Sequence, residues 1–247
     1  MKLTKMVTLS TLAVLGSLTL VTASVSAADG GVYGSSGRIQ FTPNTDPTDP
    51  VDPIDPTEPI DPIDPIDPEG PNPGTNGPLS IDFASSLDFG IQKITSTTET
   101  YKAASQKFKD KDGAEQEGPN FVQVTDNRGT EGGWTLTVKQ EDQFTSTTGK
   151  VLTGAAITLD NGEVSTASDS AAPTVIATNT LKTDGTAHKV MAAAEAQGAG
   201  TYLTRWGSDV ATAKTSISLE VPGSTTKYAE VYSANLTWTL TDVPNND

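Results

Sequence analysis

The segment Leu236-Thr-Trp-Thr-Leu-Thr-Asp-Val-Pro244 repeats a word that first stands at Trp134-Thr-Leu-Thr-Val138. In each copy, apolar residues occupy alternate positions and threonines fill the positions between them. Successive side chains of a β-strand point to opposite faces, so the apolar residues share one face and the threonines share the other. Both copies therefore predict a half-buried strand with a polar, threonine-bearing face.

Two of the three tryptophans in the chain belong to these words. Large apolar side chains on an alternating face usually fill a protein core, which favours Trp134 and Trp238 as core anchors. The alternative is a row of aromatic rings that stack on sugar rings.

The same alternation, interrupted by turn sequences such as Asp160-Asn-Gly162, continues through residues 79–247 and predicts an all-β domain. Seven or more short strands without alternating helices favour a β-sandwich or a barrel-like fold. Residues 101–112 and 191–197 do not follow the pattern, and each is interpreted as either a short helix or an ordered loop. The predicted strands are 79–83, 121–125, 134–138, 155–159, 202–206, 216–219 and 234–240.

The first residues have the three parts of a secretory signal peptide. Lys2 and Lys5 precede an apolar stretch, and small residues follow up to a cleavage site after Ala27. A membrane anchor needs about 20 predominantly apolar residues, whereas this stretch is interrupted by threonine, serine and glycine. We therefore expect residues 1–27 to be removed on export. Residues 28–44 form a short N-terminal segment with a possible strand at residues 37–41.

Residues 45–68 consist of eight tandem triplets, each with an acidic residue before a proline. Proline fixes its own φ and disfavours the α region for the residue before it. The triplets therefore predict a polyproline II rod, and we interpret residues 45–78 as an extended, acidic, Pro-rich spacer. A calcium cage is not expected, because the acids of such a rod lie about 9 Å apart, whereas one ion needs several oxygens within about 2.6 Å.

The charge and the missing cysteines limit the partners. The formal net charge is −15, and nucleic-acid binding depends on clustered Lys and Arg, so nucleic acid is not an expected partner. Without cysteine the domain has no disulfides and depends on burial for its stability. The sequence ends without an apolar tail or a Leu-Pro-x-Thr-Gly sorting signal, so we expect no membrane anchor and only non-covalent retention on a cell.

Motifs for catalysis and metal binding are incomplete. His188 is the only histidine of the chain, and no serine stands in a Gly-x-Ser-x-Gly elbow. Ser224-Thr-Thr-Lys227 has the Ser-x-x-Lys spacing of penicillin-interacting enzymes but lacks their companion motifs. An EF-hand register through Asp110-Lys-Asp-Gly113 places Phe108 and Pro119 at ligand positions, where neither supplies a carboxylate. We therefore expect no enzymatic activity, no cofactor and no metal.

The segment from Tyr232 to Pro244 resembles the distal motif of the WxL domain of low-GC Gram-positive surface proteins, Y-x-x-x-L-T-W-x-L-x-x-x-P. Trp134-Thr-Leu136 matches the proximal motif of that domain, and the signal peptide and the Asp-Pro-rich spacer agree with it. The resemblance implies non-covalent association with the cell surface by binding peptidoglycan. The resemblance implies a cell-wall-binding signature that consists of Trp134, Leu136, Tyr232, Leu236, Trp238, Leu240 and Pro244. The alternation of side chains along the strands favours a role mainly in the fold for these residues.

We therefore predict a secreted, non-enzymatic protein of the cell wall or cell surface that binds peptidoglycan. The alternative is a protein–protein interaction module or adhesin, held at the surface by a partner such as a WxL-interacting protein, or bound to host matrix. Tyr202, Arg205 and Trp206 are the candidate partner contacts, although ordinary strand positions are the simpler interpretation. An enzyme that acts on wall polymers through Ser224, Lys227 or His188 is the least favoured alternative.

Overall fold

The computed structural model describes residues 31–244, which divide into two compact units at the bond between Gln40 and Phe41. The predicted signal peptide lies outside the described residues. Residues 31–40 contain neither helix nor strand, and the apolar side chains of Val32, Tyr33 and Ile39 are exposed. The possible strand at residues 37–41 is therefore absent from the structure.

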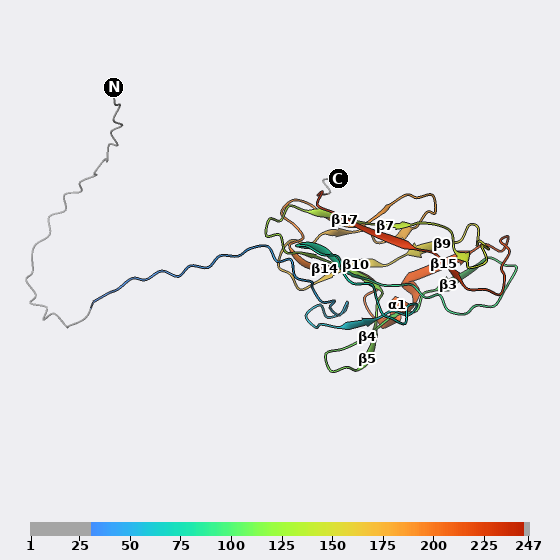
Figure 1. The fold of residues 1–247 in the computed structure, drawn as a ribbon, viewed down its shortest axis with the longest axis horizontal. Coiled ribbons are helices and arrows are strands. Elements are labelled where there is room, and N and C mark those ends of the chain that lie inside the picture. Colours follow the sequence, from blue (N-terminus) through green and yellow to red (C-terminus); the bar gives the residue numbers. More distant parts are fainter. Residues whose placement is uncertain (1–30, 245–247) are drawn as a thin grey trace, which may run out of the picture. The chain divides into compact units, whose positions relative to one another are not determined.

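The regular secondary structure of the unit that begins at Phe41 is almost entirely β-strand (Figure 1). One short helix, α1 (Val210–Ser216), is present in the described part of this unit. The strands are β1 (Asp61–Ile63), β2 (Leu79–Ala84), β3 (Glu99–Lys102), β4 (Gln106–Lys109), β5 (Glu115–Gly118), β6 (Phe121–Asp126), β7 (Trp134–Gln140), β8 (Thr145–Ser146), β9 (Ala156–Leu159), β10 (Gly162–Thr166), β11 (Thr174–Val175), β12 (Asn179–Thr180), β13 (His188–Ala193), β14 (Gly200–Trp206), β15 (Ile217–Val221), β16 (Tyr232–Ser233) and β17 (Leu236–Thr241).

Three sheets have four antiparallel strands each, in the orders β10-β14-β6-β2, β11-β13-β7-β17 and β12-β9-β15-β3. A three-stranded sheet, β1-β4-β5, and the pair β16-β8 complete the strand pairings. The first two sheets approach each other at both edges, because β17 lies beside β2 and β10 lies beside β11. The three four-stranded sheets and the three-stranded sheet form a ring, which confirms the prediction of an all-β, sandwich or barrel-like fold.

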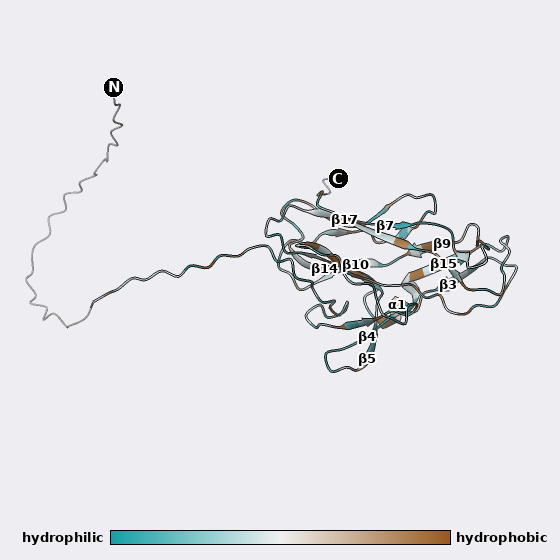
Figure 2. Ribbon diagram, viewed as in Figure 1, coloured by the Kyte–Doolittle hydropathy of each residue, from teal (hydrophilic) through white to brown (hydrophobic). Residues whose placement is uncertain are grey.

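Strand alternation builds the core. On β7 every second side chain, from Trp134 to Gln140, is buried. Figure 2 shows brown, apolar segments on strands such as β9 and β15, and these strands supply Ile157, Leu159 and Leu219 to the same core cluster as Trp134. A second, smaller cluster consists of Ile60, Phe83, Phe108, Phe121 and Leu203.

Neither of the two stretches interpreted as helix or loop is helical. Residues 101–112 contain the end of β3 and all of β4, and residues 191–197 contain the end of β13 followed by a turn. The helix α1 lies elsewhere, and its local signal is a capping box between Asp209 and Thr212. The Asp209 carboxylate accepts a hydrogen bond from the Thr212 amide at 2.7 Å, and the Thr212 hydroxyl accepts one from the Asp209 amide at 3.1 Å.

The Asp-Pro triplets differ most from the prediction. They do not form a polyproline II rod, because this part of the chain folds onto the β-domain. Strand β1 comes from the triplets and pairs with β4, which is compatible with proline because β1 is an edge strand. Ile60 is 8% exposed and belongs to the smaller core cluster. We call residues 47–75 the Asp-Pro strap.

Aspartate explains the local shape of the strap. Oδ1 of Asp52 accepts a hydrogen bond from the amide of Ile54 at 2.7 Å, and Oδ1 of Asp64 accepts one from the amide of Ile66 at 2.7 Å. An Asp side chain that binds the backbone two residues on closes an Asx turn, and the proline between them presets a turn conformation. Repeated Asp-Pro pairs therefore bend the chain at intervals, and an extended rod does not form.

Candidate functional site

The proximal Trp-Thr-Leu word lies on β7, in the interior of its sheet between β13 and β17. Trp134 is fully buried, and its indole Nε1 donates a hydrogen bond to the carbonyl oxygen of Gly198 at 3.0 Å. Gly198 has a φ of +77°, and a Cβ at this position would lie 2.7 Å from Nε1 of Trp134. The close approach of glycine therefore makes room for the indole. Trp134 is a core residue and not a surface contact.

The distal word lies on β17, at the edge of the same sheet, with β7 as its only partner in the described sheet order. Its apolar residues are half-buried and its threonines are exposed. The ring of Trp238 lies 6.1 Å from the ring of buried Trp206, measured between centroids and tilted by 45°. Leu236 and Leu240 pack against the core from the same face. The distal word therefore covers the core at the edge of its sheet.

The two ends of the distal signature also support the fold. Tyr232, on β16, accepts a hydrogen bond at its Oη from the amide of Tyr228 at 3.0 Å. Pro244 is half-buried against Gly133, where an added Cβ would lie 2.6 Å from Cβ of Pro244. The seven signature residues therefore do not converge on one exposed site, and their side chains pack into or along the domain.

The outward side of the two words is a row of polar side chains. In the antiparallel register, Thr135 faces Thr241, Thr137 faces Thr239 and Lys139 faces Thr237. We call these six residues the threonine face. The threonines of β17 are exposed and those of β7 are partly exposed. Most of the donor capacity of these hydroxyls is used locally. Thr135, Thr137 and Thr241 donate to the carbonyl oxygens of Val243, Thr239 and Thr135 at 2.8, 3.4 and 3.4 Å, and Thr237 is hydrogen-bonded to Glu141.

One carboxylate links the strands at the end of the threonine face. Glu141 forms an ion pair with Lys139 at 2.7 Å. Hydrogen bonds from Lys139 and from Thr237 of β17 lower the pKa of Glu141 below its ordinary value. Lys139 is thus paired with its neighbour, and the threonine face presents hydroxyl groups rather than net positive charge.

The structure does not place the three candidate partner contacts on a free surface. Tyr202 and Trp206 are buried, so neither is available to a partner. The Tyr202 hydroxyl donates to the Ser170 carbonyl at 2.7 Å, and burial raises the pKa of Tyr202. These are strand residues of β14 that fill the interior, as the simpler interpretation of the sequence held.

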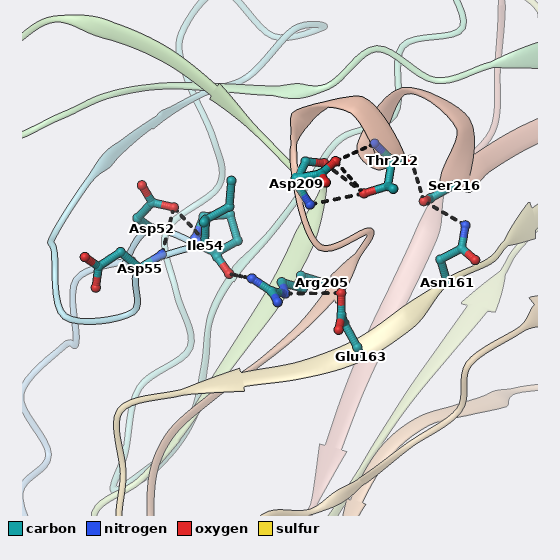
Figure 3. Close-up of polar contacts among 10 residues, drawn as sticks. Asp52, Ile54, Asp55, Asn161, Glu163, Arg205, Asp209, Thr212 and Ser216 are labelled. Atoms are coloured by element: carbon teal, nitrogen blue, oxygen red, sulfur yellow. Dashed lines mark hydrogen bonds and ion pairs between the residues drawn. The ribbon is translucent and has the colours of Figure 1, made fainter.

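Arg205, the third of these residues, fastens the Asp-Pro strap to β14 (Figure 3). Its Nη1 donates to the carbonyl oxygen of Pro53 at 2.9 Å, and its Nε lies 3.6 Å from the carboxylate of Glu163 on β10. The guanidinium therefore joins the strap and two neighbouring strands, with 15% of its side chain exposed. It is a fold contact and not a free partner contact.

Two glutamines that sequence reasoning missed also hold the strap. Gln123 is fully buried on β6, accepts a hydrogen bond from the Val51 amide at 2.9 Å and donates one to the Asp49 carbonyl at 3.0 Å. Gln106 of β4 donates to the Ile63 carbonyl at 2.8 Å. The sequence signal for this contact is Gln123 itself, because it is a polar residue on the same strand face as Phe121 and Thr125, which are both buried. Such a residue needs a buried partner, and the backbone of the strap provides it.

Asp82 lies under the strap, at a cleft of about 450 Å³ that prolines of the strap and Phe83 also line. Burial raises the pKa of Asp82, opposed by hydrogen bonds from the hydroxyls of Ser80 and Thr125 and from the Gln123 amide. No group of three or more His, Cys, Asp or Glu residues within residues 31–244 could hold a metal ion. Asp82 thus orients Gln123, and Gln123 in turn binds the backbone of the strap.

Taken together, these features define an all-β surface module with a buried aromatic core, a polar sheet face and an integrated N-terminal strap. The chain matches the family described as "WxL domain surface cell wall-binding" over residues 28–244, and it belongs to this family. It is therefore a cell-wall-associated surface protein. No curated protein and no solved structure matches the chain. None of the helical structure in residues 31–244 has the length and apolar character needed to cross a membrane.

Proposed function

We propose that the protein is exported, catalyses no reaction and binds peptidoglycan non-covalently through the threonine face of β7 and β17. The observation that carries this proposal is the orientation of the signature strands. Their apolar side chains are turned toward the core, so the side that they offer to a ligand is the row of threonines. The family match supports wall association in general.

The chemistry of the threonine face suits an uncharged part of a glycan. The hydroxyl oxygens can accept further hydrogen bonds, which matches the hydroxyl and amide donors of amino sugars. The protein has a net charge of −15, so long-range attraction would not draw it to an anionic wall. Short-range hydrogen bonds along the β7–β17 pair supply a binding mode that does not depend on charge.

The test is a pull-down of the chain from residue 28 onward with purified sacculi from which proteins and teichoic polymers have been removed. We expect the wild-type chain to sediment with the sacculi and the double variant Thr137→Ala, Thr239→Ala to sediment less. The matched control is Thr158→Ala, Thr180→Ala, which removes another cross-strand threonine pair, on β9 and β12, whose hydroxyls lie 3.0 Å apart. Equal retention of both double variants would contradict the threonine face as the contact surface.

A protein–protein interaction module is the second candidate function. The observation that favours it is the exposure of Val32, Tyr33 and Ile39, three large apolar side chains within residues 31–40. A partner wall protein or a host matrix protein would cover them. If the chain fails to bind bare sacculi but stays on whole cells, and leaves them when a partner wall protein is deleted, the interaction module is the better description.

A further inference from the structure

A hollow of about 440 Å³ lies between the loop of residues 149–153 and the loop of residues 224–228. Its lining includes Lys150, Thr153, Ser224, Thr226 and Tyr228. Its volume falls in the range of small-ligand sites, which is about 300 to 1,000 Å³. The second loop contains the Ser-x-x-Lys sequence, for which the proposed function has no use.

A signature residue builds this hollow. Tyr232 accepts a hydrogen bond from the Tyr228 amide at 3.0 Å, which fixes the end of the second loop. Tyr232 also pairs with Ser146 across β16 and β8, and Ser146 Oγ accepts a hydrogen bond from the Lys150 amide at 3.1 Å. One residue of the distal motif thus positions both walls of the hollow.

The lysine of the Ser-x-x-Lys sequence has a structural role. Nζ of Lys227 donates hydrogen bonds to the carbonyl oxygens of Pro222 at 2.9 Å and of Thr225 at 3.4 Å. These contacts close the loop on itself. The amine is engaged with backbone carbonyls, so it is not placed as a base beside the Ser224 hydroxyl.

The groups around the hollow have unused binding capacity. Within residues 31–244, the hydroxyls of Thr153, Ser224 and Thr226 have no hydrogen-bond partner. Lys150 forms no ion pair in that same part of the chain, and its Nζ lies 4.8 Å from the centre of the Tyr228 ring. Hydrogen bonds from Ser146 and Thr148, with a smaller contribution from the charge of Lys150, lower the pKa of Glu230. The Glu230 carboxylate accepts the hydrogen bond from the Thr148 hydroxyl at 2.6 Å. The hollow therefore offers free hydroxyls together with a lysine and an exposed tyrosine ring that contact each other.

We infer that this hollow binds one glycopeptide unit of peptidoglycan, with a sugar ring against Tyr228 and a carboxylate of the attached peptide at Lys150. The inference rests on the proposed function, and it assigns to the wall a second contact away from the threonine face. Aromatic rings pack against the apolar faces of sugars while free hydroxyls bind their polar edges. A polyol phosphate would supply an anion for Lys150 but no ring for Tyr228, so the glycopeptide is the better match.

The test titrates the chain from residue 28 onward with a soluble disaccharide-peptide released from sacculi, and with the same fragment after its carboxylates have been amidated. A charge-assisted hydrogen bond is stronger than a neutral one, so we expect Lys150→Gln to weaken binding of the free fragment about tenfold. Amidation should weaken binding to the wild type similarly and leave Lys150→Gln unaffected. Tyr228→Ala should weaken binding of both fragments. The matched control is Lys107→Gln on β4, an exposed lysine in another sheet.

The possible outcomes separate this inference from the proposed function. Binding to sacculi by the wild type together with unchanged fragment affinity for Lys150→Gln and Tyr228→Ala would overturn the hollow alone. Tighter binding of poly(glycerol phosphate) than of the glycopeptide, lost in Lys150→Gln, would overturn the assignment to peptidoglycan. Failure of the wild type to bind either sacculi or the fragment would overturn both proposals. Thermal unfolding of each variant shows whether a loss of binding reflects a loss of fold.

Discussion

β7 and β17 carry the same Trp-Thr-Leu word, pair with each other and differ in their place in the sheet. β7 lies between two strands, and its tryptophan is fully buried and hydrogen-bonded. β17 lies at the edge, and its tryptophan is half-buried against Trp206. The word determines which face is apolar, whereas the number of neighbouring strands determines how deeply that face is buried. Identical motifs can therefore have unequal energetic roles.

The largest expected effect is the loss of Trp134. We expect Trp134→Ala to lower the free energy of unfolding by about 3 to 5 kcal/mol, because a fully buried indole leaves a cavity. Trp238→Ala should lower it by only about 1 to 2 kcal/mol, because part of its ring already faces water. Equilibrium denaturation in urea measures both. Equal losses would show that the edge position does not reduce the contribution of Trp238.

Gly198→Ala tests the same contrast without changing either tryptophan. The new Cβ would lie 2.6 Å from Cβ of Ala193 and 2.7 Å from Nε1 of Trp134, at a φ of +77°. We expect a loss of about 2 kcal/mol in unfolding free energy, from strain at a positive φ and from displacement of the indole. Gly113→Ala is the control, because it shares a positive φ and has no atom within 4 Å of its added Cβ. If both variants lose the same amount, the indole contact contributes nothing beyond backbone strain.

The threonine pairs should matter less for stability than for binding. Cross-strand pairs contribute about 0.2 to 1 kcal/mol, so Thr239→Ala should lower the unfolding free energy by less than about 1 kcal/mol. Retention on sacculi should nevertheless fall, because the exposed side of β17 loses a hydroxyl. Thermal unfolding and sedimentation, measured on the same preparation, check the two halves of this prediction. A drop in stability comparable with that of Trp238→Ala would contradict it.

The smallest expected effect is a pH dependence at the β7–β17 pair. Hydrogen bonds from Lys139 and Thr237 lower the pKa of Glu141 from its ordinary value of 4.5. A lowered pKa in the folded state means that this stabilising link is fully present above about pH 4.5 and is lost as the pH falls through the folded-state pKa. The wild type and Glu141→Gln should therefore differ in amide hydrogen exchange of β17 at pH 7 and converge at acidic pH. A constant difference across this range would exclude the titration of Glu141 as the cause.

Much of the β-domain could be predicted from local pattern. The alternation around Trp134 and Trp238 identified both strands and the face that carries the threonines. Side chains alternate between the two faces of a strand, so burial of the apolar face places the threonines on the opposite face. The helix α1 was missed because a capping pair between Asp209 and Thr212 governs a segment too short to show helical periodicity. Its last residue, Ser216, was interpreted as the start of the following strand.

The strap and the site were harder to predict because they depend on contacts distant in sequence. Asp-Pro triplets alone favour extension, and the residues that fold them onto the domain, Gln123 and Arg205, lie on strands that the sequence does not place beside them. Arg205 was named as a candidate partner contact, with an ordinary strand position as the simpler interpretation, and its contacts lie within the domain. The hollow near Tyr228 was not predicted either, because its two walls come together only through the pairing of β16 with β8.

The attachment of the strap has a mechanical consequence. Strand β1 is joined to β4 through three residue pairs. The rest of the strap is held by separate side-chain and backbone contacts, which include hydrogen bonds at Asp49, Val51, Pro53, Asp64 and Thr75 and an ion pair at Glu58. If the N-terminal side is pulled while the β-domain is held, we expect these contacts to yield before the four-stranded sheets do. Residues 47–75 would then extend to at most about 100 Å. Single-molecule stretching should show this release as an early step, absent when the strap is deleted, so that the Asp-Pro triplets act as a reserve of tether length.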